Sequence, residues 1–95
     1  MRLVAYSSIA GAELPNLVGL QDEKLGALPT VLVCPLKGGI ALTSLRVEVQ
    51  WAGKSLIGCP ELAQPIRRTA LQAKGWLEEE PSRKIMERFQ LLLAR

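Results

Sequence analysis

The stretch LRVEVQWAGKSLIGC, residues 45–59, carries the clearest structural signal in the chain. Every second residue from Leu45 to Trp51 is apolar and the residues between are polar. This period of two is typical of a strand with one buried face. Residues 52–54, Ala-Gly-Lys, supply a turn, and residues 55–59 are expected to return as a second strand. The stretch therefore predicts a β-hairpin.

Apolar runs before the hairpin predict three more strands. Residues 30–36, TVLVCPL, are apolar and β-branched, which favours a central strand that ends at Pro35, because proline has no N–H to donate. Residues 2–9 and 18–20 are expected as strands, and residues 40–42 as a short extended piece. Residues 21–28 are expected to turn outward. The charges of Asp22 and Glu23 then belong to a solvated crossing rather than a site.

The chain changes character after Pro60. Residues 61–76 contain Pro65 and Gly75, so they predict short turns rather than one long helix. A helix is expected to begin at Pro81, with Ser82 as its N-cap. Apolar residues then recur at helical spacing: Ile85, Met86, Phe89, Leu92 and Leu93.

These elements predict a single α+β domain over residues 1–95. It would consist of a small, twisted, mainly antiparallel β-sheet of five or so strands with a C-terminal α-helix packed on it. A chain of 95 residues can bury one core but not two. Aromatic residues make up only 4% of the chain, so Leu, Val, Ile and Ala must build that core. Trp51 and Trp76 are expected to pack in it rather than to stack on bases.

The composition favours binding over catalysis. The chain has no histidine, which removes the commonest general base and metal ligand at neutral pH, so no catalytic residue, metal or cofactor is expected. Cys34 and Cys59 are expected as small buried residues at strand ends, with a disulfide between neighbouring strands as the alternative. No apolar run is long enough for export or for a membrane span, so a cytoplasmic location without a membrane partner is expected.

Arginines and lysines offer the candidate binding residues outside the helix. Arg67 and Arg68, with Lys74 nearby, form the densest positive spot of a chain whose formal charge is +3. Together with Arg46 they are candidates for binding an anion or a partner, either RNA phosphates or an acidic peptide tail. The alternatives are a solvated loop face and, for Arg46 and Glu48, a cross-strand ion pair.

Residues 15–36 resemble the CcdB family of plasmid-maintenance toxins, which shares a superfamily with the MazF, PemK and Kid toxins. The family has an early strand with a tyrosine, here Tyr6, and then the phrase P-x-L-V-x-L-Q-x-D-x-L-x-x-L-x-T-x-V-V-x-P-L. The chain keeps this phrase nearly in register at Pro15, Leu17, Val18, Leu20, Gln21, Leu25, Leu28, Thr30, Val31, Val33, Pro35 and Leu36. The likeness continues through residues 45–51, with Gly53 at the turn, and ends with the closing helix.

This resemblance implies an SH3-like barrel and the toxin component of a type II toxin–antitoxin system. Such a toxin is a cytoplasmic homodimer that acts without chemistry: it inserts its C-terminal helices into the DNA gyrase A-subunit dimer. A small acidic antitoxin neutralises it. By register, the target-binding residues are Leu92, Leu93, Ala94 and Arg95. Leu93 stands where the family has an aromatic residue, and Ala94-Arg95 replaces the Gly and apolar residue that often follow.

The leucine run at residues 91–93 also has a structural interpretation. A leucine cluster at the end of an amphipathic helix is usually core or dimer packing. Three consecutive positions cannot all face one core, so at least one leucine is expected to point away from it.

Two other functions remain open at this point. A MazF/PemK-like endoribonuclease would have to use Thr43, Ser44, Arg46 or Arg67. Beside Cys59, that branch has an arginine and an aspartate where this chain has glycine and proline. The loss of those residues, like the altered helix end, also fits a degenerate family member without toxicity.

Overall fold

The structure, a computed structural model, describes residues 1–21 and 28–94. The expected crossing with Asp22 and Glu23 therefore falls largely outside the described residues, as does Arg95. The described strands are β1 (Val4–Ser7), β2 (Leu17–Gly19), β3 (Thr30–Lys37), β4 (Val47–Trp51), β5 (Lys54–Gly58), β6 (Gln64–Arg67) and β7 (Gln72–Trp76). The helical elements are the 3-10 turns η2 (Pro60–Leu62) and η3 (Arg68–Ala70) and the helix α1 (Glu79–Leu93).

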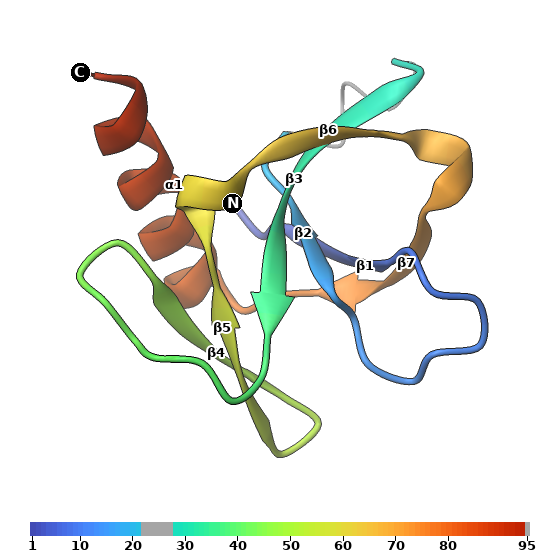
Figure 1. Cartoon of the computed structure of the whole chain (residues 1–95), viewed down its shortest axis with the longest axis horizontal. Helices are drawn as coiled ribbons and strands as arrows, with labels where there is room; N and C mark the ends of the chain where they lie inside the picture. The colour runs from blue at the N-terminus through green and yellow to red at the C-terminus, as the bar shows by residue number, and fades with distance from the viewer. Residues whose placement is uncertain (22–27, 95) are drawn as a thin grey trace.

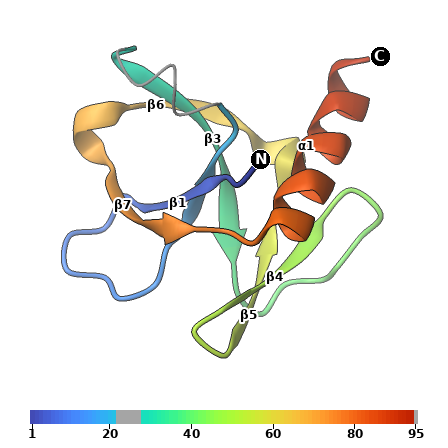
Figure 2. The same cartoon turned by 180° about the vertical axis from the view of Figure 1, so that it is seen from behind.

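All strand pairs in the sheet are antiparallel. The strand order is β4-β5-β3-β2-β1-β7, and β6 pairs with β3. The sheet curls into a half-barrel, and α1 lies beside the β4–β5 hairpin (Figures 1 and 2). The predicted α+β class, with a small antiparallel sheet and a C-terminal helix, is confirmed.

Strand β3 is the centre of the sheet, and its bounds correct the sequence prediction. It does not end at Pro35 but continues to Lys37. On one edge it pairs with β2; on the other it pairs with β6 through residue 33 and with β5 from residue 36. Pro35 falls in the interval between those two partners, where its carbonyl accepts the Cys59 N–H at 3.0 Å. The missing N–H of Pro35 therefore breaks no ladder bond.

The predicted hairpin is confirmed, with bounds shifted by one or two residues. β4 begins at Val47 because residues 43–46 form a turn, closed by the Arg46 N–H on the Thr43 carbonyl at 3.1 Å. Trp51 and Lys54 are paired across the two-residue turn, in which Ala52 and Gly53 have φ values of 50° and 80°. Two positive φ values are the geometry that suits tight hairpin turns. Residues 40–42, by contrast, form no strand.

Two strands, β6 and β7, lie where only short turns were expected. Together with η3 they form an arch, residues 64–76, that crosses one face of the half-barrel (Figure 1). Pro65 is tolerated because β6 pairs, among the described residues, only with β3. Gly75 is tolerated because β7 has a bulge beside it: Ala5 pairs with Gly75 and Tyr6 with Ala73, which leaves Lys74 as the extra residue.

Two buried clusters lie on opposite faces of the central strands. The first contains Leu3, Ala5, Val18, Leu20, Cys34, Leu36, Val47, Val49, Leu56, Leu77 and Ile85, and is covered by α1 and the hairpin. The second contains Val4, Tyr6, Leu17, Val31 and Val33, and Ile66 and Leu71 of the arch pack against it. Because β1, β2 and β3 contribute to both clusters, they read as continuous apolar runs rather than alternating ones.

Helix α1 starts earlier than its sequence suggests. It begins at Glu79, with Glu78 as N-cap, so Pro81 lies in its first turn, where backbone N–H groups have no partner within the helix. The Ser82 N–H makes the first helical hydrogen bond, to the Glu78 carbonyl at 3.2 Å. Ser82 is not the N-cap. Its hydroxyl donates to the Glu78 carbonyl at 2.7 Å and accepts the Leu3 N–H at 3.0 Å. Ser82 thus joins the helix start to the strand at the N-terminus.

Candidate binding surfaces

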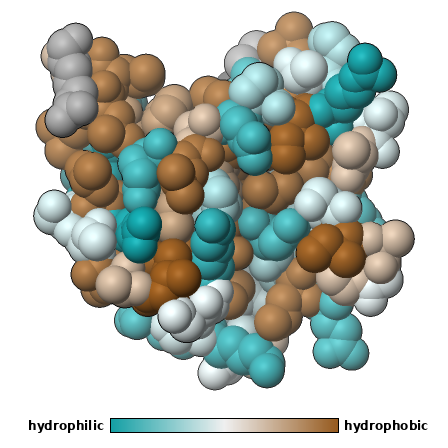
Figure 3. All heavy atoms as spheres, viewed as in Figure 1, coloured by the Kyte–Doolittle hydropathy of each residue, from teal (hydrophilic) through white to brown (hydrophobic). Residues whose placement is uncertain are grey.

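The C-terminal end of α1 is an exposed apolar surface. Leu91 is 62% and Leu93 68% exposed, whereas Leu92 is half-buried. The expectation that at least one leucine points away from the core is therefore confirmed. In Figure 1 the last turn extends past the sheet, and Figure 3 shows hydrophobic side chains gathered over that end. Ala94 follows as an exposed C-cap.

The earlier turns of α1 fix this end in place. Ile85 is fully buried in the first cluster, and Phe89 and Met86 pack against that cluster. Arg88 donates from Nε to the Ser44 carbonyl at 3.0 Å. The helix is thus anchored along its first three turns, and its final turn carries the unburied leucines.

Arg46 does not make the expected cross-strand pair. It precedes β4, and its Nε lies 2.8 Å from Oε2 of Glu61 in η2, while its Nη1 donates to the Ala41 carbonyl at 3.0 Å. The hydrogen bond with Glu61 raises the pKa of Arg46 above its usual value. Glu48 instead accepts a hydrogen bond from Ser55 of β5 at 2.9 Å. Arg46 therefore ties the 40–46 loop to η2.

Glu61 was not predicted from the sequence as a site residue. The one feature of the sequence that distinguishes it is its position directly after Cys59 and Pro60. The two side chains of the Arg46–Glu61 pair are each 23% exposed, so the pair is partly shielded from water. The ribonuclease alternative would use Thr43, Ser44, Arg46 or Arg67. The first three lie in the turn at residues 43–46, whereas Arg67 belongs to the arch.

Three of the predicted basic residues lie in the arch. Arg67 ends β6 and is exposed, Arg68 begins η3, and Lys74 is the half-buried bulge residue of β7. Arg68 Nε donates to the Leu28 carbonyl at 2.9 Å. The structure thus gathers Arg67, Arg68 and Lys74 in one segment and places Arg46 elsewhere.

A pocket of about 290 Å³, here called the Trp76 pocket, opens between β1 and the arch. Its lining residues are Val4, Tyr6, Arg68, Leu71, Ala73, Gly75 and Trp76. Trp76 is 52% exposed, so the prediction that both tryptophans pack in the core is wrong for this one. It lies in the edge strand β7, which the sequence did not reveal. Trp51 does pack against the first cluster.

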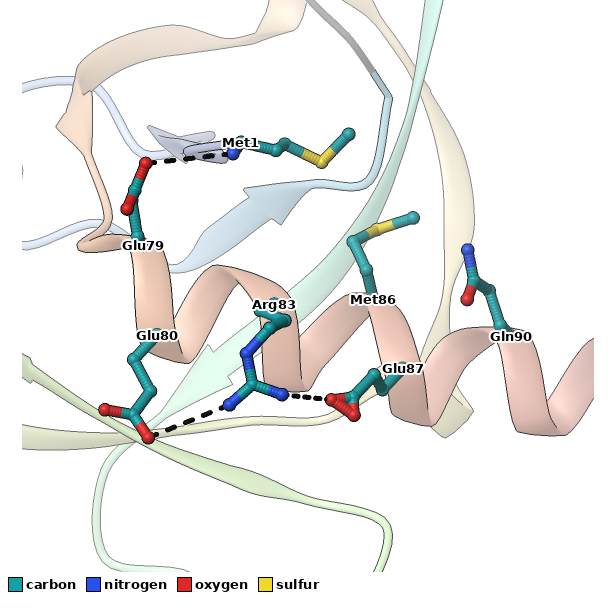
Figure 4. Close-up of a pocket in the computed structure, with 7 residues that line it drawn as sticks. All are labelled: Met1, Glu79, Glu80, Arg83, Met86, Glu87 and Gln90. Atoms are coloured by element: carbon teal, nitrogen blue, oxygen red, sulfur yellow. Dashed lines mark hydrogen bonds and ion pairs between the residues drawn. The ribbon is translucent and has the colours of Figure 1, made fainter.

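A larger groove, of about 600 Å³, runs along the exposed face of α1 (Figure 4). It is lined by Met1, Glu79, Glu80, Arg83, Met86, Glu87 and Gln90. Its charges largely pair with one another. The Met1 amino group lies 4.0 Å from Glu79, and Arg83 contacts both Glu80 and Glu87. The groove therefore offers no concentrated charge of one sign to a ligand.

Both cysteines are buried free thiols, so the predicted burial is confirmed and the disulfide alternative is not adopted. Burial, with a smaller contribution from Cys59, raises the pKa of Cys34 to about 12. Within residues 1–21 and 28–94, no three His, Cys, Asp or Glu side chains are grouped closely enough to hold a metal ion.

Neither the protein-family models nor the curated proteins contain a match to this chain. In the described part of the chain, no helix has both the length and the apolar character needed to cross a bilayer.

Proposed function

We propose that this chain is the toxin component of a type II toxin–antitoxin system, similar to CcdB, which acts by binding a large cellular enzyme. The first candidate target is the DNA gyrase A subunit. The observation that carries the proposal is the exposed leucine end of α1, at the position where the CcdB resemblance puts target-binding residues.

The leucine end has the properties of an interface anchor. Burying one leucine side chain contributes about 1.5–3 kcal/mol, and a helix fixed along its earlier turns loses little conformational entropy on binding. Leu91 and Leu93 are both more than half exposed, so a partner can bury most of their apolar surface. Where the CcdB family has one aromatic anchor, this chain has these two smaller apolar side chains.

The proposal includes a cytoplasmic homodimer, which would present two such helix ends to a symmetric target. It also includes neutralisation by an acidic, partly disordered antitoxin that becomes ordered on binding. Arg67 and Lys74 are exposed or half-exposed cations that can meet acidic side chains of such a segment.

Purified gyrase provides the test. Supercoiled plasmid incubated with gyrase, ATP and this protein is expected to accumulate double-strand breaks after protein denaturation. Leu93→Asp is expected to reduce breakage, since a buried unpaired carboxylate opposes insertion. Lys54→Gln, at the exposed tip of the hairpin, is the control and should act like the wild type.

The plasmid assay and a parallel incubation with purified RNA separate the alternatives. Intact plasmid at every concentration of the wild-type protein would contradict gyrase as the target. Discrete cuts in purified RNA, abolished by Arg67→Ala, would support the ribonuclease instead.

A further inference from the structure

The Trp76 pocket lies away from the leucine end of α1. The proposed function assigns no occupant to the pocket, although it uses the neighbouring cations Arg67 and Lys74. Its volume of about 290 Å³ is at the lower limit of small-ligand sites, which suits a single ring side chain rather than a large cofactor. It forms the mouth of the second buried cluster, because Val4 and Tyr6 belong to that cluster and also line the pocket.

Much of the pocket wall is apolar, and it includes an open aromatic surface. Leu71 and Ala73 provide aliphatic surface, and Trp76 leaves half of its side chain exposed to solvent. Aromatic rings pack on an indole with more energy than their buried area alone provides. The pocket therefore favours a flat apolar group.

The charged residues that the structure describes at the pocket, or next to its lining residues in the chain, are basic. Arg68 lines it, and its guanidinium is oriented by the 2.9 Å hydrogen bond from Nε to the Leu28 carbonyl. Arg67 precedes it in the chain, and Lys74 lies between two lining residues of β7. No carboxylate is among the described lining residues. An occupant with negative charge beside its ring is therefore favoured.

The lining also distinguishes a phenyl ring from a nucleobase. The polar edge of a nucleobase must find hydrogen-bond partners when it is buried, or its desolvation opposes binding. Val4, Leu71 and Ala73 have no polar side-chain atom to offer, and Tyr6 and Arg68, which do carry polar groups, already have other partners. A phenyl ring has no polar edge, so it loses nothing against these residues.

We propose that the Trp76 pocket binds an acidic peptide segment through one aromatic residue. The ring packs against Trp76 and Leu71, and the flanking carboxylates meet Arg67 and Lys74. Strand β7 forms one side of the pocket and pairs, among the described residues, only with β1. The peptide backbone can therefore lie along its outer edge, as in strand addition.

The test uses the full chain and two fluorescein-labelled peptides, Asp-Glu-Phe-Glu-Asp and Asp-Glu-Ala-Glu-Asp. Fluorescence anisotropy is expected to show the phenylalanine peptide binding about tenfold or more tightly, as truncation of a central anchor implies. Lys54→Gln, which removes one positive charge at the hairpin tip, is the control and is expected to bind the peptide like the wild type.

Ala73, an exposed pocket residue, allows a matched pair of variants. Ala73→Asp is expected to weaken binding of the phenylalanine peptide about tenfold or more, whereas Ala73→Asn, of nearly equal size, should weaken it far less. Thermal melting establishes that both variants fold. If Ala73→Asp fails to fold, Trp76→Ala replaces it, because half of that side chain is already in water.

Several results would overturn the proposal. These are equal affinity for the two peptides, insensitivity to Ala73→Asp and Trp76→Ala, or no binding at about 1 mM peptide. Single-stranded RNA that binds in place of the peptide, with the same sensitivity to the variants, would also overturn it in favour of a nucleic-acid site. None of these results depends on gyrase, so failure here is distinct from failure of the toxin proposal.

Discussion

At the scale of single residues, Ser82 shows how one small side chain can join distant parts of a chain. Its hydroxyl is fully buried, donates to Glu78 at the start of α1 and accepts the Leu3 N–H at the N-terminal end of the sheet. The sequence indicated a serine near a helix start, and an N-cap is the commonest role for it there. Which backbone group the hydroxyl meets depends on tertiary packing.

Ser82→Ala is therefore expected to destabilise the protein by about 1–3 kcal/mol, because the Leu3 N–H is left buried without a partner. Ser55→Ala is the matched control: Ser55 is exposed and, within residues 1–21 and 28–94, its hydroxyl donates to Glu48. Urea unfolding of both variants measures the difference. Equal midpoints would show that the buried hydroxyl contributes no more than the exposed one.

Cys34 gives the chain a pH dependence on the alkaline side. Burial raises its pKa from 9.0 to about 12, so between those values the folded state keeps a proton that the unfolded state releases. The free energy of unfolding therefore falls as pH rises through this window, by at most about 1.4 kcal/mol per pH unit. Below it, Cys34 contributes no pH dependence.

Between about pH 8 and about pH 10.5, the free energy of unfolding is expected to fall less for Cys34→Ala than for the wild type. At about pH 8 the variant is less stable than the wild type, because the substitution leaves a cavity. Urea unfolding at the two pH values is the measurement. A stability difference between the two proteins that stays constant with pH would contradict a shifted Cys34 pKa.

At the scale of elements, the hairpin and the central strand were predictable because their signals are local. A period of two, a glycine turn and a β-branched run each act within a few residues. Strands β6 and β7 were missed because Pro65 and Gly75 argue locally against strands. Their pairing with β3 and β1 comes from partners more than 30 residues away in the chain. Long-range packing overrides local propensity here.

The contrast between local and long-range signals also explains which site residues could be predicted from the sequence. An exposed leucine followed from three consecutive leucines, which no single helix face can bury. The Trp76 pocket and the Arg46–Glu61 pair did not follow, since each requires knowing which loops meet. For Arg46, the alternative of an ion pair across its strand is wrong: it contacts η2, because β4 starts one residue after it.

A substitution at Gly75 tests how much the bulge in β7 contributes to stability. Its φ of 148° is one that residues with a Cβ avoid, and an added Cβ would lie 3.1 Å from the Trp51 ring. Gly75→Ala is expected to cost about 1–3 kcal/mol. The control is Gly38→Ala, where the nearest atom would be 3.8 Å away and the backbone is not in the positive-φ region. Similar melting temperatures for the two variants would indicate that β7 relaxes without cost.

At the scale of the whole molecule, the structure combines a half-barrel with one protruding helix end, and the proposed function adds a second copy of the chain. The homodimer included in the proposed function predicts a mass near twice 10.4 kDa at micromolar concentration. Light scattering after size-exclusion chromatography measures it. A mass of 10.4 kDa over the accessible concentration range would count against a toxin of this kind.

The most direct measurement is growth of a bacterial culture after induction of this protein alone, with plasmid DNA and total RNA sampled as growth stops. The wild type is expected to arrest growth with broken or relaxed DNA and sound RNA. Leu93→Asp, expected to fold within about 0.5 kcal/mol of the wild type because the site is exposed, should lose the arrest. Unaffected growth with soluble wild-type protein would contradict the account.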